Sequence, residues 1–152
     1  VQGWGLRFHS EAWAGPAPTH NIQAAARRAR YQFLAAQQRR LELPAVLVGH
    51  TQDDVIETFL MRLGRGSSLR GLAVLPPQQT LFGATIWRPL LGCSRASLRG
   101  YLQAQQIPWF DDPSNHNPDF WRVRVRGLQP VLQAAGLDPA AIAASVAGLH
   151  AA

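Results

Sequence analysis

Residues 45–58 read AVLVGHTQDDVIET, and this stretch decides the fold. Its first four residues are apolar, with the length and composition of a buried parallel strand. Gly49 and His50 follow that strand, and Thr51 stands where the N-cap of a following helix belongs. The spacing from Thr51 to Asp54 is that of a capping box, which supports the helix start. A strand that ends where a helix begins is the place at which open α/β sheets bind ligands.

Three carboxylates lie in the first turns of the predicted helix, namely Asp53, Asp54 and Glu57. Helical spacing of three and four residues places them on one face. Such a cluster is costly unless it binds cations or transfers protons. With His50 it therefore indicates a site, which would hold magnesium at Asp53 and Asp54 or the ammonium of an amine substrate. The alternative is that the two aspartates only complement the helix dipole.

Outward from this stretch, the patterns predict strands that alternate with helices, which is typical of an α/β fold with a parallel sheet. The predicted elements are an edge strand within 4–13, a helix at 22–41 capped by Asn21, the strand at 45–48, a helix from Thr51 to about 63, a strand at 84–87, a helix at 96–105 capped by Ser94, a helix beginning at Asn117-Pro118, and an alanine-rich helical C-terminal end. The residues predicted to face the core are Ala25, Ala29, Phe33 and Ala36, then Val55, Ile56, Phe59, Leu60 and Leu63, then Leu98, Tyr101 and Leu102.

The 152-residue chain has a formal net charge of +6, and all of its 15 basic residues are arginines. A GC-rich genome explains the missing lysine, but it does not explain why the arginines cluster within 27–30, 39–40, 62–70 and 122–126. Guanidinium groups suit phosphate, so the clusters favour a nucleic-acid partner. Residues 65–68, RGSS, would cradle a phosphate with backbone N–H groups or would simply end a helix.

Cys93 is the only cysteine, which excludes a disulfide framework and a zinc knuckle and fits a reducing cytosol. No apolar run reaches the length that spans a membrane.

Six segments, in this order, resemble the tRNA(Ile)-lysidine synthase family of N-type ATP pyrophosphatases. They are ARRARY at 26–31, GHTQDDVIET at 49–58, LGRGSSLRGL at 63–72, RPLL at 88–91, WFDDPSN at 109–115, and the pair Arg122 and Arg126. The resemblance implies a Rossmann-like parallel sheet with flanking helices, of the adenine nucleotide α-hydrolase-like kind. Residues 1–127 would be part of the catalytic domain and 128–152 a helical tail.

The resemblance also implies an activity. Family members are ligases that use ATP, with Mg²⁺, to adenylate the wobble cytidine (C34) of the AUA-reading isoleucine tRNA, and lysine then displaces AMP to form lysidine. The expected partners are the tRNA anticodon arm and free lysine, in the cytoplasm, with a homodimer as one expected assembly. Asp54 and Glu57 would receive the lysine amine, and Arg30 and Arg122 would stabilise the phosphate or the activated cytidine. The residues expected to bind substrate are His50, Asp53, Arg65 and Arg126.

The family grips ATP with a Ser-Gly-Gly-x-Asp-Ser loop that these 152 residues do not contain. We therefore expect the first strand and that loop to be missing, and this fragment alone to be inactive. Two alternatives stay open, a non-catalytic tRNA-binding remnant and a tRNA thiolase of the same group. The single cysteine argues against the thiolase. A hydrolase that uses magnesium-bound water is a remote third.

Overall fold

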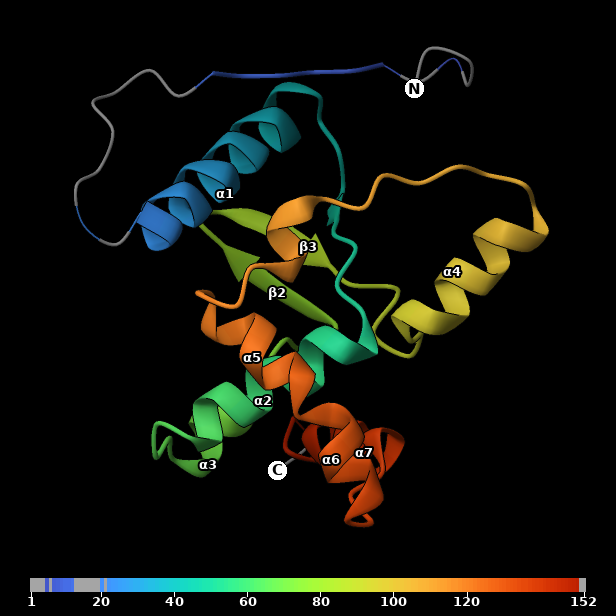
Figure 1. Ribbon diagram of the computed structural model, residues 1–152. Helices are drawn as coiled ribbons and strands as arrows, with labels where there is room; N and C mark the ends of the chain where they lie inside the picture. The colour runs from blue at the N-terminus through green and yellow to red at the C-terminus, as the bar shows by residue number, and fades with distance from the viewer. Residues whose placement is uncertain (1–4, 6, 13–19, 21, 151–152) are drawn as a thin grey trace. The chain divides into compact units, whose positions relative to one another are not determined.

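The computed structural model describes residues 5, 7–12, 20 and 22–150. Its elements are α1 (Ile22–Arg40), β1 (Val46–Leu47), α2 (Gln52–Leu63), α3 (Leu69–Leu72), β2 (Gln78–Leu81), β3 (Ala84–Trp87), α4 (Arg95–Ala104), the 3₁₀ helix η2 (Pro113–His116), α5 (Trp121–Gly127), α6 (Gln129–Ala134) and α7 (Pro139–Gly148) (Figure 1). The strands form one sheet in the order β1-β3-β2. The chain divides into two compact units, Val1–Val46 with Gln79–Ile86, and Leu47–Gln78 with Trp87–Ala152.

The predicted mixture of helices and strands is confirmed, but the parallel Rossmann-like sheet is found only in part. β2 and β3 are neighbours joined by two residues, so they form an antiparallel hairpin. Phe82 and Gly83 in that turn have φ values of 51° and 81°, as a type I′ turn requires. The strand at 84–87 was predicted. β2 was not, because its sequence QQTL carries only one apolar residue. β1 is short, and Leu47 is exposed, so the expected full burial of this strand was wrong.

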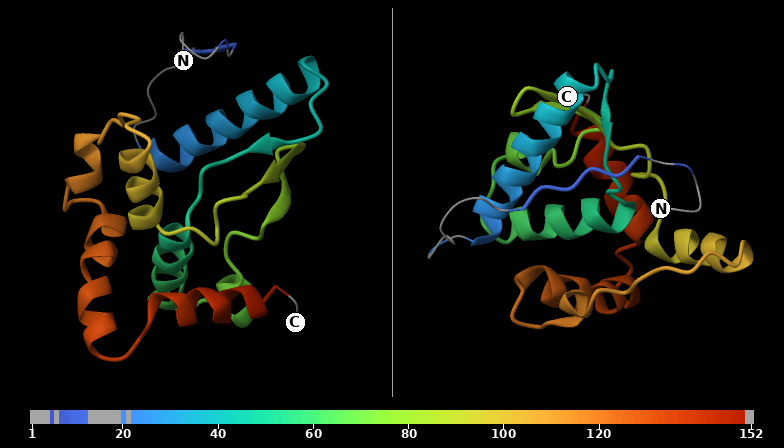
Figure 2. Two further views of the ribbon diagram at one scale, coloured as in Figure 1. Left: turned by 90° about the vertical axis from the view of Figure 1, so that its right-hand side faces the viewer. Right: turned by 90° about the horizontal axis from the view of Figure 1, so that it is seen from above.

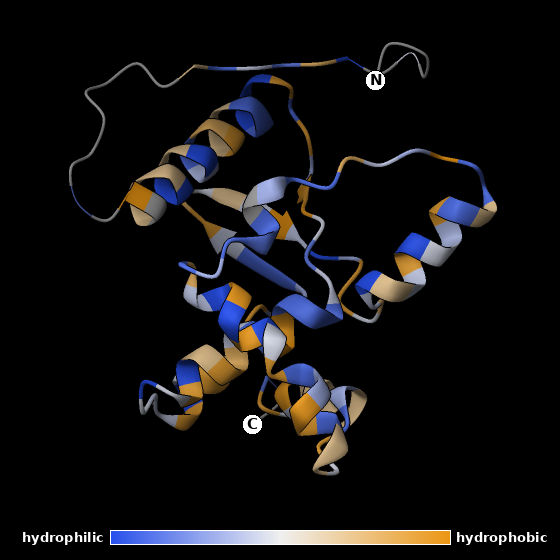
Figure 3. Cartoon of the chain, viewed as in Figure 1, coloured by the Kyte–Doolittle hydropathy of each residue, from blue (hydrophilic) through white to orange (hydrophobic). Residues whose placement is uncertain are grey.

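In the first unit, α1 lies along the β2–β3 hairpin (Figure 1). The amide of Gln38 connects them, because its Oε1 accepts the backbone N–H of Thr85 at 2.9 Å. The buried residues of α1 are Tyr31 and Ala35, one helical turn apart. The predicted stripe is confirmed only in part, since Ala25, Ala29 and Phe33 are half-buried but Ala36 is exposed. Polar and apolar residues alternate along α1 (Figure 3), and its arginines are exposed, with Arg28 over the Phe82 ring of the hairpin.

In the second unit, the core is built where α7 packs against α2 (Figure 2). Val55 of α2, Val74 and Val146 of α7 form its buried cluster. The predicted burial of Val55 and Ile56 is confirmed, whereas Leu63 at the last turn of α2 is exposed. Alanine-rich α7, predicted only as part of a helical end, thus supplies part of the core.

The other predicted helices are present with shifted starts. Ser94 caps α4 by accepting the backbone N–H of Ser97 at 3.0 Å, as predicted, but Tyr101 faces solvent. α5 begins at Trp121 rather than after Asn117, because the Asn117 side chain accepts the Asp119 backbone N–H at 2.9 Å and forms a turn first. The described residues 7–12 form no strand. Gly5 is in a turn, and residues 4, 6 and 13 of the predicted edge strand, together with Asn21, lie outside the described residues.

No single described helix is both long and apolar enough to cross a membrane. One helix pair bent by 107°, Trp121–Ala134 with Pro139–Gly148, meets the length and composition criteria only when the two are taken together.

Candidate active site

The site is built at the first turn of α2, where the predicted capping box is present. One oxygen of Asp54, Oδ2, accepts the backbone N–H of Thr51 at 2.8 Å and the Thr51 hydroxyl at 2.9 Å. These bonds complete the start of α2 and hold the carboxylate in one orientation. The second oxygen of Asp54, Oδ1, is left to face other groups.

The start of α4 lies beside the start of α2, since the Gln52 backbone N–H donates to the carbonyl oxygen of Cys93 at 2.9 Å. Asp53 joins the two helices, because its Oδ2 accepts the backbone N–H of Arg95, the first residue of α4, at 2.8 Å. Both helix N-termini are electropositive, so acids at their junction are stabilised. The first turn of α2 is accordingly the hydrophilic end of that helix (Figure 3).

The Arg95 side chain connects the other two acids. Its Nη2 lies 2.8 Å from Asp54 Oδ1, and its Nη1 lies 2.7 Å from Glu57 Oε1. A weaker bond of 3.3 Å joins Nη2 to Glu57 Oε2, so the guanidinium faces Glu57 with both of its terminal nitrogens. Such two-pronged contacts are among the stronger ion pairs in proteins.

Glu57 is fully buried, with 0% of its side chain exposed. Besides Arg95, it accepts a hydrogen bond from Arg126 Nε on α5 at 2.8 Å. An unpaired carboxylate in this position would be very costly, and the two arginines offset that cost. The helical spacing that predicted a shared acidic face is confirmed, and arginines complement that face.

Arg122 is held more loosely than the other two arginines. Its Nη1 lies 3.6 Å from Asp54 Oδ1 and its Nε lies 3.7 Å from Glu57 Oε2, both beyond hydrogen-bond distance. Its Nη2 donates to the Thr58 hydroxyl at 3.1 Å, and 43% of the side chain is exposed. Arg122 therefore offers positive charge to the cleft at small structural cost.

The pKa of Asp54 lies below its ordinary value of 3.8. Burial alone would raise it, but the Thr51 backbone N–H, the Arg95 charge, the Thr51 hydroxyl and the Arg122 charge together outweigh burial. Burial would likewise lower the pKa of Arg95, yet the hydrogen bond and charge of Glu57, with the charges of Asp54 and Asp53, raise it. The contact between Asp54 and Arg95 thus favours the charged form of both side chains.

These residues open on a cleft of about 840 Å³. Its lining includes the polar side chains of Asp53, Asp54, Arg95, Arg99, Asp111, His116, Arg122 and Arg126. On its outer part Asp111 pairs with Arg99 at 3.2 Å and approaches His116 at 3.5 Å. Burial acts to raise the pKa of Asp111, but His116, Asn115 and Arg99 lower it. The cleft thus presents arginine and acid side chains together.

The remaining predicted site residues lie apart from the acid cluster or have other contacts. His50 Nδ1 accepts a hydrogen bond from buried Arg88 at 3.2 Å, and Arg88 also donates to the Pro76 carbonyl at 2.6 Å. Arg65 stacks over the Trp121 ring at 4.5 Å. Arg30 belongs to α1 in the first unit, and its role stays a prediction.

The backbone around Arg65 favours the helix-end interpretation over the phosphate cradle. The N–H groups of Gly64 and Gly66 donate to Leu60 and Leu63 at 2.9 Å, and those of Arg65 and Ser67 both donate to Arg62 at 3.1 Å. The carbonyls at the end of α2 thus occupy these donors. Gly66 has φ of +68°, a conformation that glycine adopts without strain.

Sequence reasoning missed Arg95. Its position could have indicated a role. Arg95 directly follows the capping Ser94, so its charge lies at the electropositive end of α4, where nearby acids would stabilise it. No group of three His, Cys, Asp or Glu side chains in the described residues is arranged to hold a metal. The Asp53 and Asp54 oxygens instead accept bonds from Thr51 and Arg95.

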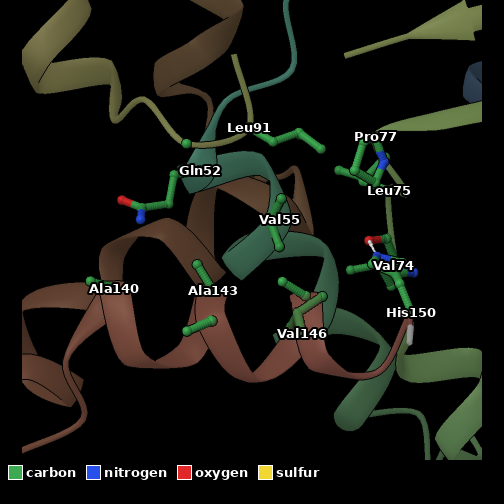
Figure 4. A pocket seen from close by; sticks show the side chains of 13 residues that line it. Gln52, Val55, Val74, Leu75, Pro77, Leu91, Ala140, Ala143, Val146 and His150 are labelled. Carbon is green, nitrogen blue, oxygen red and sulfur yellow. Dashed lines mark hydrogen bonds between the residues drawn. The ribbon is translucent and has the colours of Figure 1, made fainter. Parts of the chain in front are cut away.

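A second cavity of about 360 Å³ lies between α2, residues 74–77 and α7 (Figure 4). Val55, Ala143 and Val146 face one another across it, and His150 bonds to the Val74 carbonyl at 3.0 Å. Its lining is mostly apolar and carries no charged pair. It is best explained by the short alanine side chains of α7.

Comparison with known proteins decides the family. Residues 2–132 match the PP-loop domain. The chain belongs to the PP-loop domain family. It is also similar to proteins named tRNA(Ile)-lysidine synthase. Identity is 42% over 139 residues with that of Bradyrhizobium sp., 38% over 147 residues with that of Ruegeria pomeroyi and 44% over 126 residues with that of Rhodopseudomonas palustris.

These alignments cover 91%, 97% and 83% of this PP-loop chain. They cover 39%, 35% and 36% of the three relatives, so the chain spans well under half of their length. The resemblance drawn from the ordered motifs is confirmed. The PP-loop family implies the use of ATP.

Proposed function

We propose that the full-length protein containing this chain ligates lysine to the wobble cytidine of isoleucine tRNA at the expense of ATP. The observation that carries the proposal is Asp54 in the lining of an arginine-rich cleft, with buried Glu57 joined to it through the guanidinium of Arg95. The similarity to proteins named tRNA(Ile)-lysidine synthase supports the choice of substrates. An acidic pocket suits an ammonium nucleophile, and neighbouring guanidinium groups suit a phosphate leaving group.

The first half-reaction needs positive charge near phosphate. ATP, when bound, supplies the adenylyl group that activates the C2 oxygen of cytidine, with release of pyrophosphate. We assign the phosphate contact to Arg122, because it is half-exposed toward the cleft and its acidic neighbours lie beyond hydrogen-bond distance. Arg30 is a second proposed contact.

The second half-reaction needs the ε-ammonium of lysine beside the cytidine. We assign it to Asp54 and Glu57, where it would share the carboxylate oxygens that now face Arg95. The low pKa of Asp54 makes this carboxylate a good binder of cations and a poor base. Its role is therefore to hold the ammonium, and the proton leaves through another group as the amine attacks and AMP departs.

The other predicted residues support this pair. Asp53 fixes the start of α4, and Arg126 holds Glu57 in place, so both position the acids. His50 is assigned a supporting structural role, because its ring accepts a hydrogen bond from buried Arg88. Arg65, exposed beside Trp121, is assigned to the tRNA backbone. Magnesium is a proposed companion of ATP, but Asp53 Oδ2 and both oxygens of Asp54 already accept hydrogen bonds from Thr51 and Arg95, and no step is assigned to the ion.

The test is incorporation of radiolabelled lysine into unmodified isoleucine tRNA by the full-length protein. We expect incorporation that requires ATP and is abolished when the wobble cytidine is replaced by uridine. Tight tRNA binding with no lysine product would favour the non-catalytic remnant. Sulfur transfer instead of lysine transfer would favour the thiolase. We further propose a cytoplasmic location, in line with the single free Cys93, and a homodimer that sedimentation would detect.

A further inference from the structure

The segment between α4 and η2 exposes two adjacent aromatic side chains. Trp109 is 46% exposed and Phe110 is 84% exposed. Burial of such side chains is a main source of folding free energy, so leaving both in solvent forgoes stability. Neither residue belongs to a helix or strand. Single exposed apolar side chains are common on protein surfaces, but two adjacent aromatic rings form a patch that another molecule can contact.

The segment is anchored at both ends. At its start, Gln106 has φ of 55°, and Ile107 donates its backbone N–H to the Leu102 carbonyl at 2.9 Å, which closes α4 in a Schellman motif. At its end, Asp111 pairs with Arg99 of α4 at 3.2 Å. The aromatic pair therefore lies between the end of α4 and an exposed contact that returns the chain to α4.

The segment leads directly into the cleft. Arg99, Asp111, Asn115 and His116 line the same cleft as the acid cluster. Trp109 is two residues before Asp111, so their Cα atoms are at most about 7 Å apart. A strand bound along this segment would reach the cleft within a nucleotide or two. The side chains of Arg99 and His116, both more than half exposed, provide hydrogen-bond donors beside the path of such a strand.

We propose that Trp109 and Phe110 form a stacking surface for unpaired nucleotides that flank the wobble cytidine in the anticodon loop. This inference rests on the proposed function, which supplies the RNA. Single-stranded loops are recognised by stacking of splayed bases on aromatic rings, with arginine along the backbone. An aromatic pair followed by arginine-lined walls has that composition. The surface would hold the neighbours while the cytidine enters the cleft.

The test uses the full-length protein and a synthetic anticodon stem-loop, with a fully paired RNA of the same length as second probe. Trp109→Leu combined with Phe110→Ala should weaken stem-loop binding by roughly ten-fold or more, since base stacking accounts for about that factor. Binding of the paired RNA should be unchanged. Phe8→Ala is the matched control, because Phe8 is 73% exposed in the first unit and should have no effect.

Two further readouts separate stacking from a structural role. Stem-loop addition should quench tryptophan fluorescence in the wild type and much less in Trp109→Leu. In ligation, the KM for tRNA should rise while kcat at saturating tRNA is retained. Unchanged stem-loop affinity, or equal loss for both RNAs, overturns the inference. If the wild type ligates lysine while the variant binds normally, only the stacking surface fails. If the wild type itself ligates no lysine, the proposed function fails.

Discussion

Glu57 shows at the scale of single residues why the site has its arginines. The carboxylate is fully buried and ionised partners approach it from two helices, Arg95 from α4 and Arg126 from α5. Removing one partner of a buried ion pair usually costs more than the pair contributes, because the remaining charge stays desolvated. The ion pairs of Glu57 therefore contribute to the stability of this region as well as to the charge of the proposed site.

Arg95→Ala should lower the free energy of unfolding by about 2–3 kcal/mol, because Glu57 and Asp54 lose their closest cation while Arg126 still partly compensates. Chemical denaturation of the full-length protein measures this. Arg99→Ala is the matched control, since its ion pair with Asp111 is exposed and surface pairs contribute about 0–1 kcal/mol. Equal effects of the two substitutions would contradict the network.

The lowered pKa of Asp54 should make the protein less stable in acid. The native pKa of Asp54 lies below the ordinary value of 3.8, so the native state binds this proton less readily than the unfolded state. The contribution is fully present above the ordinary pKa and is lost as the pH falls through the lower native pKa. Between about pH 5 and pH 2, Asp54→Asn should flatten the fall in unfolding free energy relative to wild type. An unchanged slope would remove Asp54 from the pH response.

At the scale of elements, two helix starts create the site. The capping residues Thr51 and Ser94 fix where α2 and α4 begin, and the acids and Arg95 follow directly. Helix caps are local, so the sequence predicted both starts to within a residue. The contact between the two starts is not local. Arg95 and Asp54 are 41 positions apart, and no periodicity connects them.

The same distinction explains the other differences from the predictions. The β2–β3 hairpin depends on a turn with positive φ at Phe82 and Gly83, and Phe82 gives no local signal for that conformation. Tyr101 was expected inside because helical periodicity identifies an apolar face but not what covers it. The acid face of α2 needs only helical spacing, and it was predicted correctly. Its arginine partners required the tertiary structure.

Ser94→Ala should destabilise the protein by about 1 kcal/mol, because the first turn of α4 loses its side-chain acceptor for the Ser97 N–H. The same change should loosen Arg95, the next residue, and so raise the KM for lysine. Thermal melts and lysine titrations of the full-length protein measure the two effects. Ser145→Ala is the control, since that hydroxyl only bonds back to Ala141 within α7. If the KM for lysine of Ser94→Ala equals that of Ser145→Ala, the cap of α4 does not position the site.

At the scale of the whole molecule, arginine has two uses. Arg95, Arg122 and Arg126 neutralise the buried acids, and the arginines of α1 remain exposed, where they would meet the phosphates of an RNA. The clustering of arginines predicted a nucleic-acid partner, which stays a prediction, and it did not predict the arginines that pair with the acids. Because the chain spans well under half of its relatives, the proposed ligation belongs to the full-length protein.

The most direct measurement separates the two half-reactions in the full-length protein, comparing wild type with Asp54→Asn. Asp119→Asn, the same change at an exposed aspartate, is the control. We expect tRNA-dependent pyrophosphate release to be retained and the KM for lysine to rise roughly ten- to a hundred-fold, the loss expected for one charge-assisted contact. The melting temperature would verify folding. A folded Asp54→Asn protein that transfers lysine with the wild-type KM would contradict the assignment of the acid pair to the lysine ammonium.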